Sequence, residues 1–325
     1  MAFVERVVTE TTELALENLL LPEHSALRDI FGDVLTKRST QRGSDCFIFR
    51  LLAHNHVHEL GELNRDCSVY IRELGLEEAK RKCRRELKGM ERRPMREFNA
   101  RCGDFLAEMA AIRVLSNDGF YQFRSIAESQ PETNDYRAYW RQVPAYVEVK
   151  NLHANETILD VFKREIGRAH QRQPSAYAFD LRIDYAFDYP PTGEQERIIR
   201  DFIPRIGGRK PPFRETLNLV NGLATIDVTV GAGTTFLCRG VGGDWPEAVN
   251  HEWVLRKVRE KAEQGREQIP IGDHMKVFVI NVDSTNAVLP FDFVGNAEQE
   301  IREVFGNNVR PYVLHFRHSV KLINS

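Results

Sequence analysis

The sequence predicts an α/β protein, α+β overall, in which a helical N-terminal region over 1–96 precedes a larger domain over 97–325. Three observations predict this fold. Apolar residues recur at helical spacing through most of the N-terminal region, and helix and strand patterns alternate from residue 98 onward. A segment rich in strand and turn signals, over about 186–250, interrupts that alternation and is predicted to be a β-rich insertion.

The N-terminal region is expected to consist of helices. Gly75 is the expected break between the last two of them, because glycine disfavours a helix interior. One short run, Cys-Phe-Ile-Phe over 46–49, has the apolar pattern of a strand. The segments with helical spacing are 13–21, 26–35, 51–74 and 76–87.

From residue 98 the pattern predicts a helix, three strands, a helix and a strand, in that order. The turn residues Asn117, Asp118 and Gly119 end the first helix. The second and third strands are close enough in sequence to form a hairpin. The expected ranges are 98–115 and 156–171 for the helices, and 120–126, 136–140, 145–152 and 176–185 for the strands.

Inside the expected insertion, Asn221-Gly222 lies between two strand-like runs, which is a strong hairpin signal. A third strand is expected over 234–238. The α/β alternation then resumes to the end of the chain. Its expected elements are helices over 252–268 and 297–305 and strands over 276–282 and 312–316.

The chain has 45 Lys and Arg residues and 47 Asp and Glu residues. This near-neutral balance excludes a globally basic nucleic-acid coat protein. No apolar run reaches the ~18 residues of a membrane span. The N-terminus lacks the basic and apolar regions of a signal peptide. The five cysteines form no CxxC pair, so a structural zinc site is not expected. These features predict a cytoplasmic protein with reduced thiols and no membrane partner.

A local basic patch is compatible with this overall charge. Lys and Arg are concentrated over 80–96, with Glu86 and Glu91 among them. Two interpretations of this basic segment stay open: a solvated helix face, or a surface that contacts phosphates. The nucleic-acid-binding candidates in this segment are Lys82, Arg84, Arg85, Lys88, Arg92 and Arg93.

The residues most indicative of chemistry lie on the third strand of the alternating region. Side chains alternate along a strand, so Glu148 and Lys150 point to one face and Val147 and Val149 to the other. Charged groups are costly to bury unless they are paired or bound to an ion. Asp135 is expected at the same end of the hairpin. Asp135, Glu148 and the backbone carbonyl of Val149 therefore form a candidate site for Mg²⁺ or Mn²⁺.

This arrangement resembles the PD-(D/E)XK nuclease superfamily, also called the restriction-endonuclease-like fold. The resemblance is carried by Glu108 on a helix, Asp135 at the second strand and Glu148-Val149-Lys150 on the third, within an element order over 98–185 similar to the family's αβββαβ core with its mixed sheet. Asn134 stands where the family's name has proline. The resemblance implies that Asp135 and Glu148 bind the metal, that Lys150 is catalytic, and that Glu108 assists, either directly or through water.

The resemblance also implies a function, a Mg²⁺-dependent nuclease that hydrolyses phosphodiester bonds, with double-stranded DNA as the expected substrate. An endonuclease in defence against foreign DNA, a homodimer and a separate ATPase or defence-system partner are compatible with it. His153 lies just after Lys150 and is a candidate for contacting the nucleic acid. Members of the family often supply a Gln or Lys from the helix after the catalytic strand, and Gln171 is one candidate.

Three alternatives stay open. The helix and strand that close the core are either those over 156–185 or the later pair over 252–282, which offers Lys257, Lys261 and Gln264. The chain is alternatively a non-catalytic nucleic-acid-binding or interaction protein, in which Glu148 and Lys150 pair with each other. A third function is a hydrolase that acts on a small phosphorylated molecule.

Overall fold

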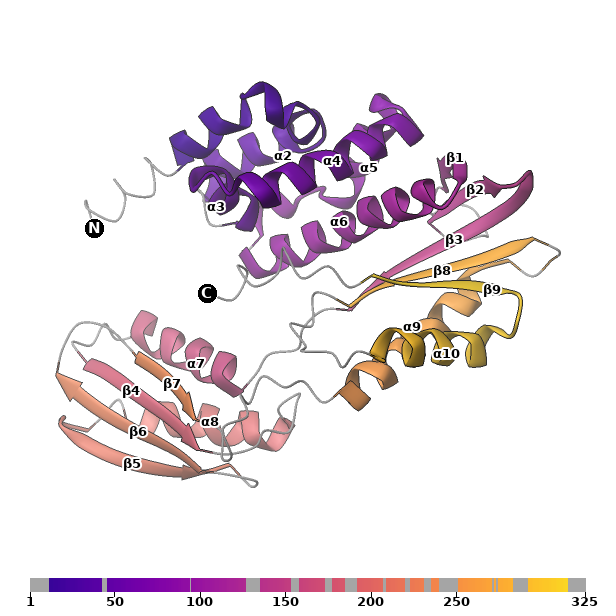
Figure 1. Ribbon diagram of the computed structural model, residues 1–325. Coiled ribbons are helices and arrows are strands. Elements are labelled where there is room, and N and C mark those ends of the chain that lie inside the picture. Colours follow the sequence, from indigo (N-terminus) through magenta and orange to yellow (C-terminus); the bar gives the residue numbers. More distant parts are fainter. Residues whose placement is uncertain are drawn as a thin grey trace. The chain divides into compact units, whose positions relative to one another are not determined.

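The structure is a computed structural model, and most of the chain is described in it (Figure 1). The described residues are 12–42, 46–93, 95–126, 135–152, 158–172, 177–184, 192–206, 209–219, 223–230, 235–239, 251–270, 272, 274–282 and 292–314. The chain divides into two compact units. The described residues up to 152 and from Leu255 onward lie in the first unit, and those within Ala154–Val254 lie in the second.

The first unit contains a mixed five-stranded sheet in the order β1-β2-β3-β8-β9. The first three strands are antiparallel neighbours, and β8 and β9 continue the sheet in parallel with β3. This agrees with the expected mixed sheet. The strands are β1 (Phe120–Ser125), β2 (Tyr136–Trp140), β3 (Val143–Asn151), β8 (Met275–Asn281) and β9 (Val309–Leu314).

Helices cover both faces of this sheet, with α6 (Met95–Asn117) on one face and α9 (His251–Gln268) and α10 (Phe293–Phe305) on the other (Figure 1). Val147 and Val149 of β3 are buried in one hydrophobic cluster with residues of α6. On the other face, Phe278 of β8 packs so closely on Gly265 of α9 that a side chain at 265 would collide with it. The alternation of β3 residues therefore directs Glu148 toward α9 and the valines toward α6.

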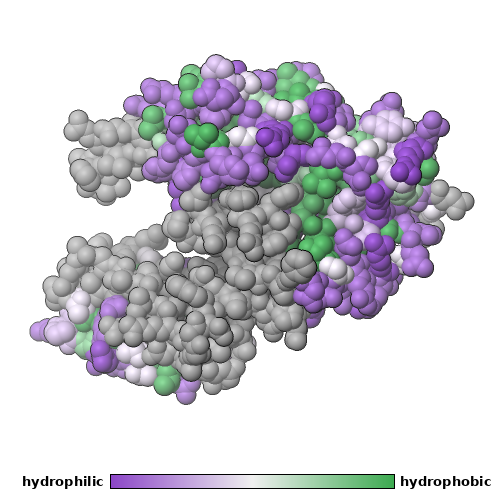
Figure 2. All heavy atoms as spheres, viewed as in Figure 1, coloured by the Kyte–Doolittle hydropathy of each residue, from purple (hydrophilic) through white to green (hydrophobic). Residues whose placement is uncertain are grey.

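The N-terminal helices share their hydrophobic core with α6 and the sheet, because buried residues from 15 to 149 form one cluster. The expected domain boundary at 96/97 therefore differs from the structure, in which both sides of it lie in the first unit. Figure 2 shows mostly hydrophilic side chains on the visible surface of these helices, with small apolar patches between them. The helical elements are a helix over 12–19, α2 (Ser25–Arg42), α3 (Phe47–Ala53), α4 (Val57–Leu74) and α5 (Leu76–Glu86), with 3₁₀ turns at Pro22–His24 and Met90–Arg92.

The strand expected at 46–49 is wrong, because this segment begins helix α3. Six of the seven α3 residues are buried, so the helix is apolar on nearly all sides. A short apolar run of this kind has no periodicity that separates a buried helix from a buried strand.

The second unit contains its own four-stranded sheet in the order β5-β6-β4-β7. Its core is a separate cluster that includes Phe162, Leu181, Ile199 and Ile226. The hairpin expected around Asn221-Gly222 is confirmed by the antiparallel pairing of β5 with β6. The elements are α7 (Ile158–Arg172), β4 (Tyr177–Asp184), α8 (Gly193–Ile206), β5 (Phe213–Asn218), β6 (Leu223–Val230) and β7 (Thr235–Arg239).

This arrangement decides one open alternative and corrects the expected start of the insertion. Strand β4 pairs with β6 and β7, so the helix and strand over 156–185 do not close the first sheet. The later pair, α9 and β8, does so. The inserted unit therefore begins near residue 154 rather than 186, and it contains helices α7 and α8 besides its strands. Among the described residues, no helix is both long and apolar enough to cross a bilayer.

Candidate active site

Asp135 lies immediately before β2, at the point where the pairing of β2 with β3 ends. The last pair of that ladder is Tyr136 with Val147. Beyond it, Oδ2 of Asp135 accepts a hydrogen bond of 2.8 Å from the backbone N–H of Val149. The N–H and C=O of one strand residue point to the same side of the strand. The Val149 carbonyl therefore also points toward the side where Asp135 lies.

Glu148 and Lys150 are adjacent on the α9 face of β3. Glu148 is only 1% exposed, and its Oε1 forms an ion pair with Lys150 Nζ. Lys150 also donates a hydrogen bond to the side chain of Gln268, the last residue of α9. Among the described residues, Oε2 of Glu148 has no hydrogen-bond partner although it is buried. A buried carboxylate oxygen without a partner is costly, so this atom favours a bound cation.

Glu108 enters the site from α6, where the side chains of Tyr136 and Lys82 hold it. Its Oε2 accepts a hydrogen bond of 2.5 Å from the Tyr136 hydroxyl and forms an ion pair with Lys82 of α5. The Tyr136 hydroxyl lies 2.8 Å from that of Tyr70. Lys82 Nζ also lies 4.1 Å from the centroid of the Tyr136 ring, a cation–π contact. This buried network fixes the position of the Glu108 carboxylate beside Asp135.

The three carboxylates interact electrostatically. Burial, and then the negative charge of Glu108, raise the pKa of Asp135 to about 6. Burial, and then the negative charge of Asp135, raise the pKa of Glu148 to about 8, although Lys150 opposes this. Glu108 and Glu148 approach from opposite faces of the sheet, and Asp135 lies between them at the strand end. The arrangement concentrates negative charge in a buried place, as cation sites do.

The donor atoms fit a hard divalent cation. Asp135 and Glu148 supply carboxylate oxygens, and the Val149 carbonyl supplies a third oxygen, as expected from the sequence. In the part of the chain that the structure describes, no group of three or more His, Cys, Asp or Glu side chains is arranged as a metal site. Of the three carboxylates, those of Asp135 and Glu148 would bind a cation directly, because Glu108 is held by Lys82 and Tyr136.

The structure corrects one of the expected nucleic-acid contacts. Lys82 is 2% exposed and is paired with Glu108, so it lies inside the site rather than on the surface. Other members of the basic segment form ion pairs on the helix surface: Arg84 with Asp33, Arg85 with Glu86 and Arg93 with Glu97. Lys88 and Arg92 follow α5 and are both exposed.

The two remaining nucleic-acid-binding candidates are His153 and Gln171. His153 lies outside the described residues. Gln171 is on α7 of the second unit, and its side chain is outside the description. Gln268, at the C-terminal end of α9, takes the position beside Lys150 that was expected for Gln171 or Gln264. Gln268 is the last polar residue of the helix before β8, and this position is the sequence feature that could have identified it.

No protein-family model, no curated protein and no solved structure matches this chain in the comparisons. The geometry of the site therefore carries the functional argument.

The raised pKa of Glu148 predicts that the stability of the metal-free protein depends on pH. The ordinary pKa of 4.5 applies in the unfolded chain, and the folded value is about 8. Glu148 therefore favours the folded state most below about pH 4.5, and this contribution is lost as the pH rises through about 8. In EDTA, we expect the free energy of unfolding of the wild type, relative to Glu148→Gln, to fall by several kcal/mol across this range.

Urea denaturation at about pH 5 and about pH 9 checks this expectation. Glu263→Gln, which changes an exposed carboxylate on α9, is the control and should not reproduce the effect. A difference between wild type and Glu148→Gln that stays constant over this range would contradict the assigned burial of an ionisable Glu148.

Proposed function

We propose that the protein is a metal-dependent nuclease that hydrolyses phosphodiester bonds with Mg²⁺ or Mn²⁺. The observation that carries the proposal is the buried Oε2 of Glu148, which has no hydrogen-bond partner among the described residues and lies beside Asp135 and Lys150. The element order α6-β1-β2-β3-α9-β8 supports it, because this is the order expected of a restriction-endonuclease-like core.

The proposed roles follow from the contacts. Asp135, Glu148 and the Val149 carbonyl hold the cation, which neutralises phosphate charge and makes a bound water more acidic. Lys150, held between Glu148 and Gln268, is placed to stabilise negative charge that develops on the phosphate. Glu108, fixed by Lys82 and Tyr136, adds negative charge that favours cation binding.

The substrate we propose is DNA, and the cellular role is defence against foreign DNA. A homodimer and a separate ATPase partner are compatible with that role. Both parts of this proposal rest on the resemblance of the motif Glu148-Val149-Lys150 and Asp135 to the nuclease superfamily.

A second candidate function is a non-catalytic nucleic-acid-binding protein. The ion pair between Glu148 and Lys150 favours it, because the pair neutralises one carboxylate without a metal. The two functions differ in one outcome, since only the nuclease requires a divalent cation and releases cleaved strands.

Incubation with linear, circular and single-stranded DNA and with RNA tests the nuclease proposal. We expect cleavage of DNA with Mg²⁺ or Mn²⁺ and none in EDTA. Glu148→Gln should be inactive, and Glu263→Gln, purified in the same way, should keep wild-type activity, which excludes a contaminating nuclease. Wild-type protein that cleaves none of these polymers with either metal, while still binding them, would assign the second function instead.

A further inference from the structure

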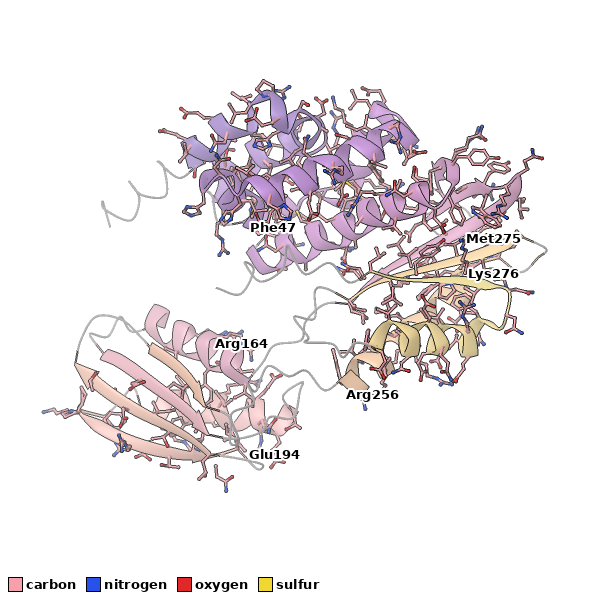
Figure 3. The ribbon with its side chains drawn as sticks, in the orientation of Figure 1. Phe47, Arg164, Glu194, Arg256, Met275 and Lys276 are labelled. Atoms are coloured by element: carbon pink, nitrogen blue, oxygen red, sulfur yellow. The ribbon has the colours of Figure 1, made fainter. Side chains whose placement is uncertain are left out.

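Six side chains form a continuous surface on the sheet face that carries Glu148 and Lys150. The strand registers pair Tyr121 with Tyr139, Arg124 with Arg137, and Tyr146 with both Arg137 and Lys276. Cross-strand partners lie on the same face of a sheet. We call Tyr121, Arg124, Arg137, Tyr139, Tyr146 and Lys276 the aromatic–basic face. Figure 3 labels Lys276 near the beginning of β8.

The two tyrosines at its outer end are exposed aromatic rings. Tyr121 is 38% exposed and Tyr139 is 41% exposed. Their ring centroids are 6.1 Å apart with an interplanar angle of 30°, so the rings present broadly similar planes to solvent. Exposed rings of this kind are platforms on which nucleic-acid bases stack.

The charges of this face attract an anion. Arg124 and Arg137 are directly opposite each other on β1 and β2, and both are exposed. Two arginines side by side make this part of the face positively charged, and positive charge attracts phosphate groups. The Arg137 guanidinium also lies 5.1 Å from the centroid of the Tyr146 ring, so charge and aromatic surface are combined. A phosphate backbone with unpaired bases complements both features.

The aromatic–basic face leads directly to the candidate active site. Tyr146, Glu148 and Lys150 are successive residues on one face of β3, so each is about 6–7 Å from the next. Glu148 is buried under Gly265 of α9. A strand of nucleic acid on this face would therefore reach the site beside Asp135, which is partly exposed and lies two positions before Arg137.

We infer that the aromatic–basic face binds a single-stranded stretch of nucleic acid and directs its phosphates to Asp135 and Glu148. This inference rests on the proposed nuclease function and narrows its substrate to nucleic acid that has unpaired bases. A fully paired duplex keeps its bases stacked on each other, so they are not available to the tyrosine rings. The positive charge of the two arginines favours this anionic occupant over an apolar protein partner.

Fluorescence anisotropy with a labelled oligothymidylate about twenty nucleotides long tests the inference in EDTA, where cleavage is prevented. The combined variant Tyr121→Ala and Tyr139→Ala should bind at least about tenfold more weakly, and the matching Phe variant should bind like wild type, because the ring faces remain. Arg124→Ala should lower the salt dependence by about 0.7 of a logarithmic slope unit. Leu223→Ala and Arg200→Ala, exposed positions of the second unit, are the controls.

Three results would overturn the inference. These are unchanged binding by the Ala variant, binding of a matched duplex that is as tight and equally sensitive to the same variant, and no binding by wild type. Wild-type self-association that the Ala variant loses, without oligonucleotide binding, would assign the face to a protein contact. Oligonucleotide binding through the tyrosines without any cleavage would keep the inference about binding and reject the nuclease. Cleavage by the wild type, together with unchanged binding by the Ala variant, would keep the nuclease proposal and reject the inference about binding.

Discussion

Replacing Lys150 by methionine is expected to lower Mg²⁺-dependent cleavage by a factor of about 10²–10³ or more. The Lys150 ammonium contacts Glu148 and Gln268 at the site, and Lys150 is not among the described residues of the hydrophobic core. Its loss removes charge stabilisation during the reaction, and the raised pKa of Glu148 lets that carboxyl take up a proton and remain buried. We therefore expect a folded but inactive protein.

The matched control for Lys150→Met is Lys261→Met. Lys261 is also on α9, and it donates to Gln264 in the same kind of Lys–Gln pair, but on the surface. Cleavage rates of both variants, with circular dichroism and thermal denaturation to verify folding, are the measurements. A cleavage rate of Lys150→Met equal to that of the wild type would show that Lys150 has no role in the reaction.

Replacing Lys82 by methionine is expected to destabilise the fold by about 3–5 kcal/mol, because one partner of a buried ion pair is removed. Burial alone would lower the pKa of Lys82, but the charges of Glu108 and Asp135 raise it above its ordinary value, so the lysine is charged. Its loss leaves Glu108 buried with only the Tyr136 hydroxyl. The double variant Lys82→Met with Glu108→Gln should recover a large part of the stability.

Urea denaturation of the single and double variants measures this effect, and Arg81→Met is the control. Arg81 is the preceding residue of α5, and its side chain is 72% exposed. An unfolding free energy of Lys82→Met equal to that of the control would contradict the buried ion pair. It would also remove the link between α5 and the candidate site.

The sequence predicted the local parts of the site well. Helix α6, the three strands after it and the alternation that separates Glu148 and Lys150 from the valines depend on short-range patterns. The position of Asp135 at the strand end followed from the hairpin between β2 and β3. These features are read from neighbouring residues, so one sequence is enough to predict them.

Non-local features were not predictable in the same way. The pairs α7–β4 and α9–β8 have similar patterns, and only strand pairing decides that β8 joins β3. Lys82 lies in a strongly charged helix. It points inward to Glu108, whereas the nearby Arg81 and Arg84 form ion pairs on the surface, and nothing in the sequence pattern shows this difference. Its burial depends on the packing of α5 against α6 and the sheet.

The central claim is that Asp135 and Glu148 together hold a divalent cation, and calorimetric titration with Mn²⁺ tests it most directly. The account predicts heat of binding in the wild type and in the Glu263→Gln control, and its loss in Asp135→Asn and in Glu148→Gln. Equal heats in the wild type and both site variants, or no heat in any of them, would contradict it.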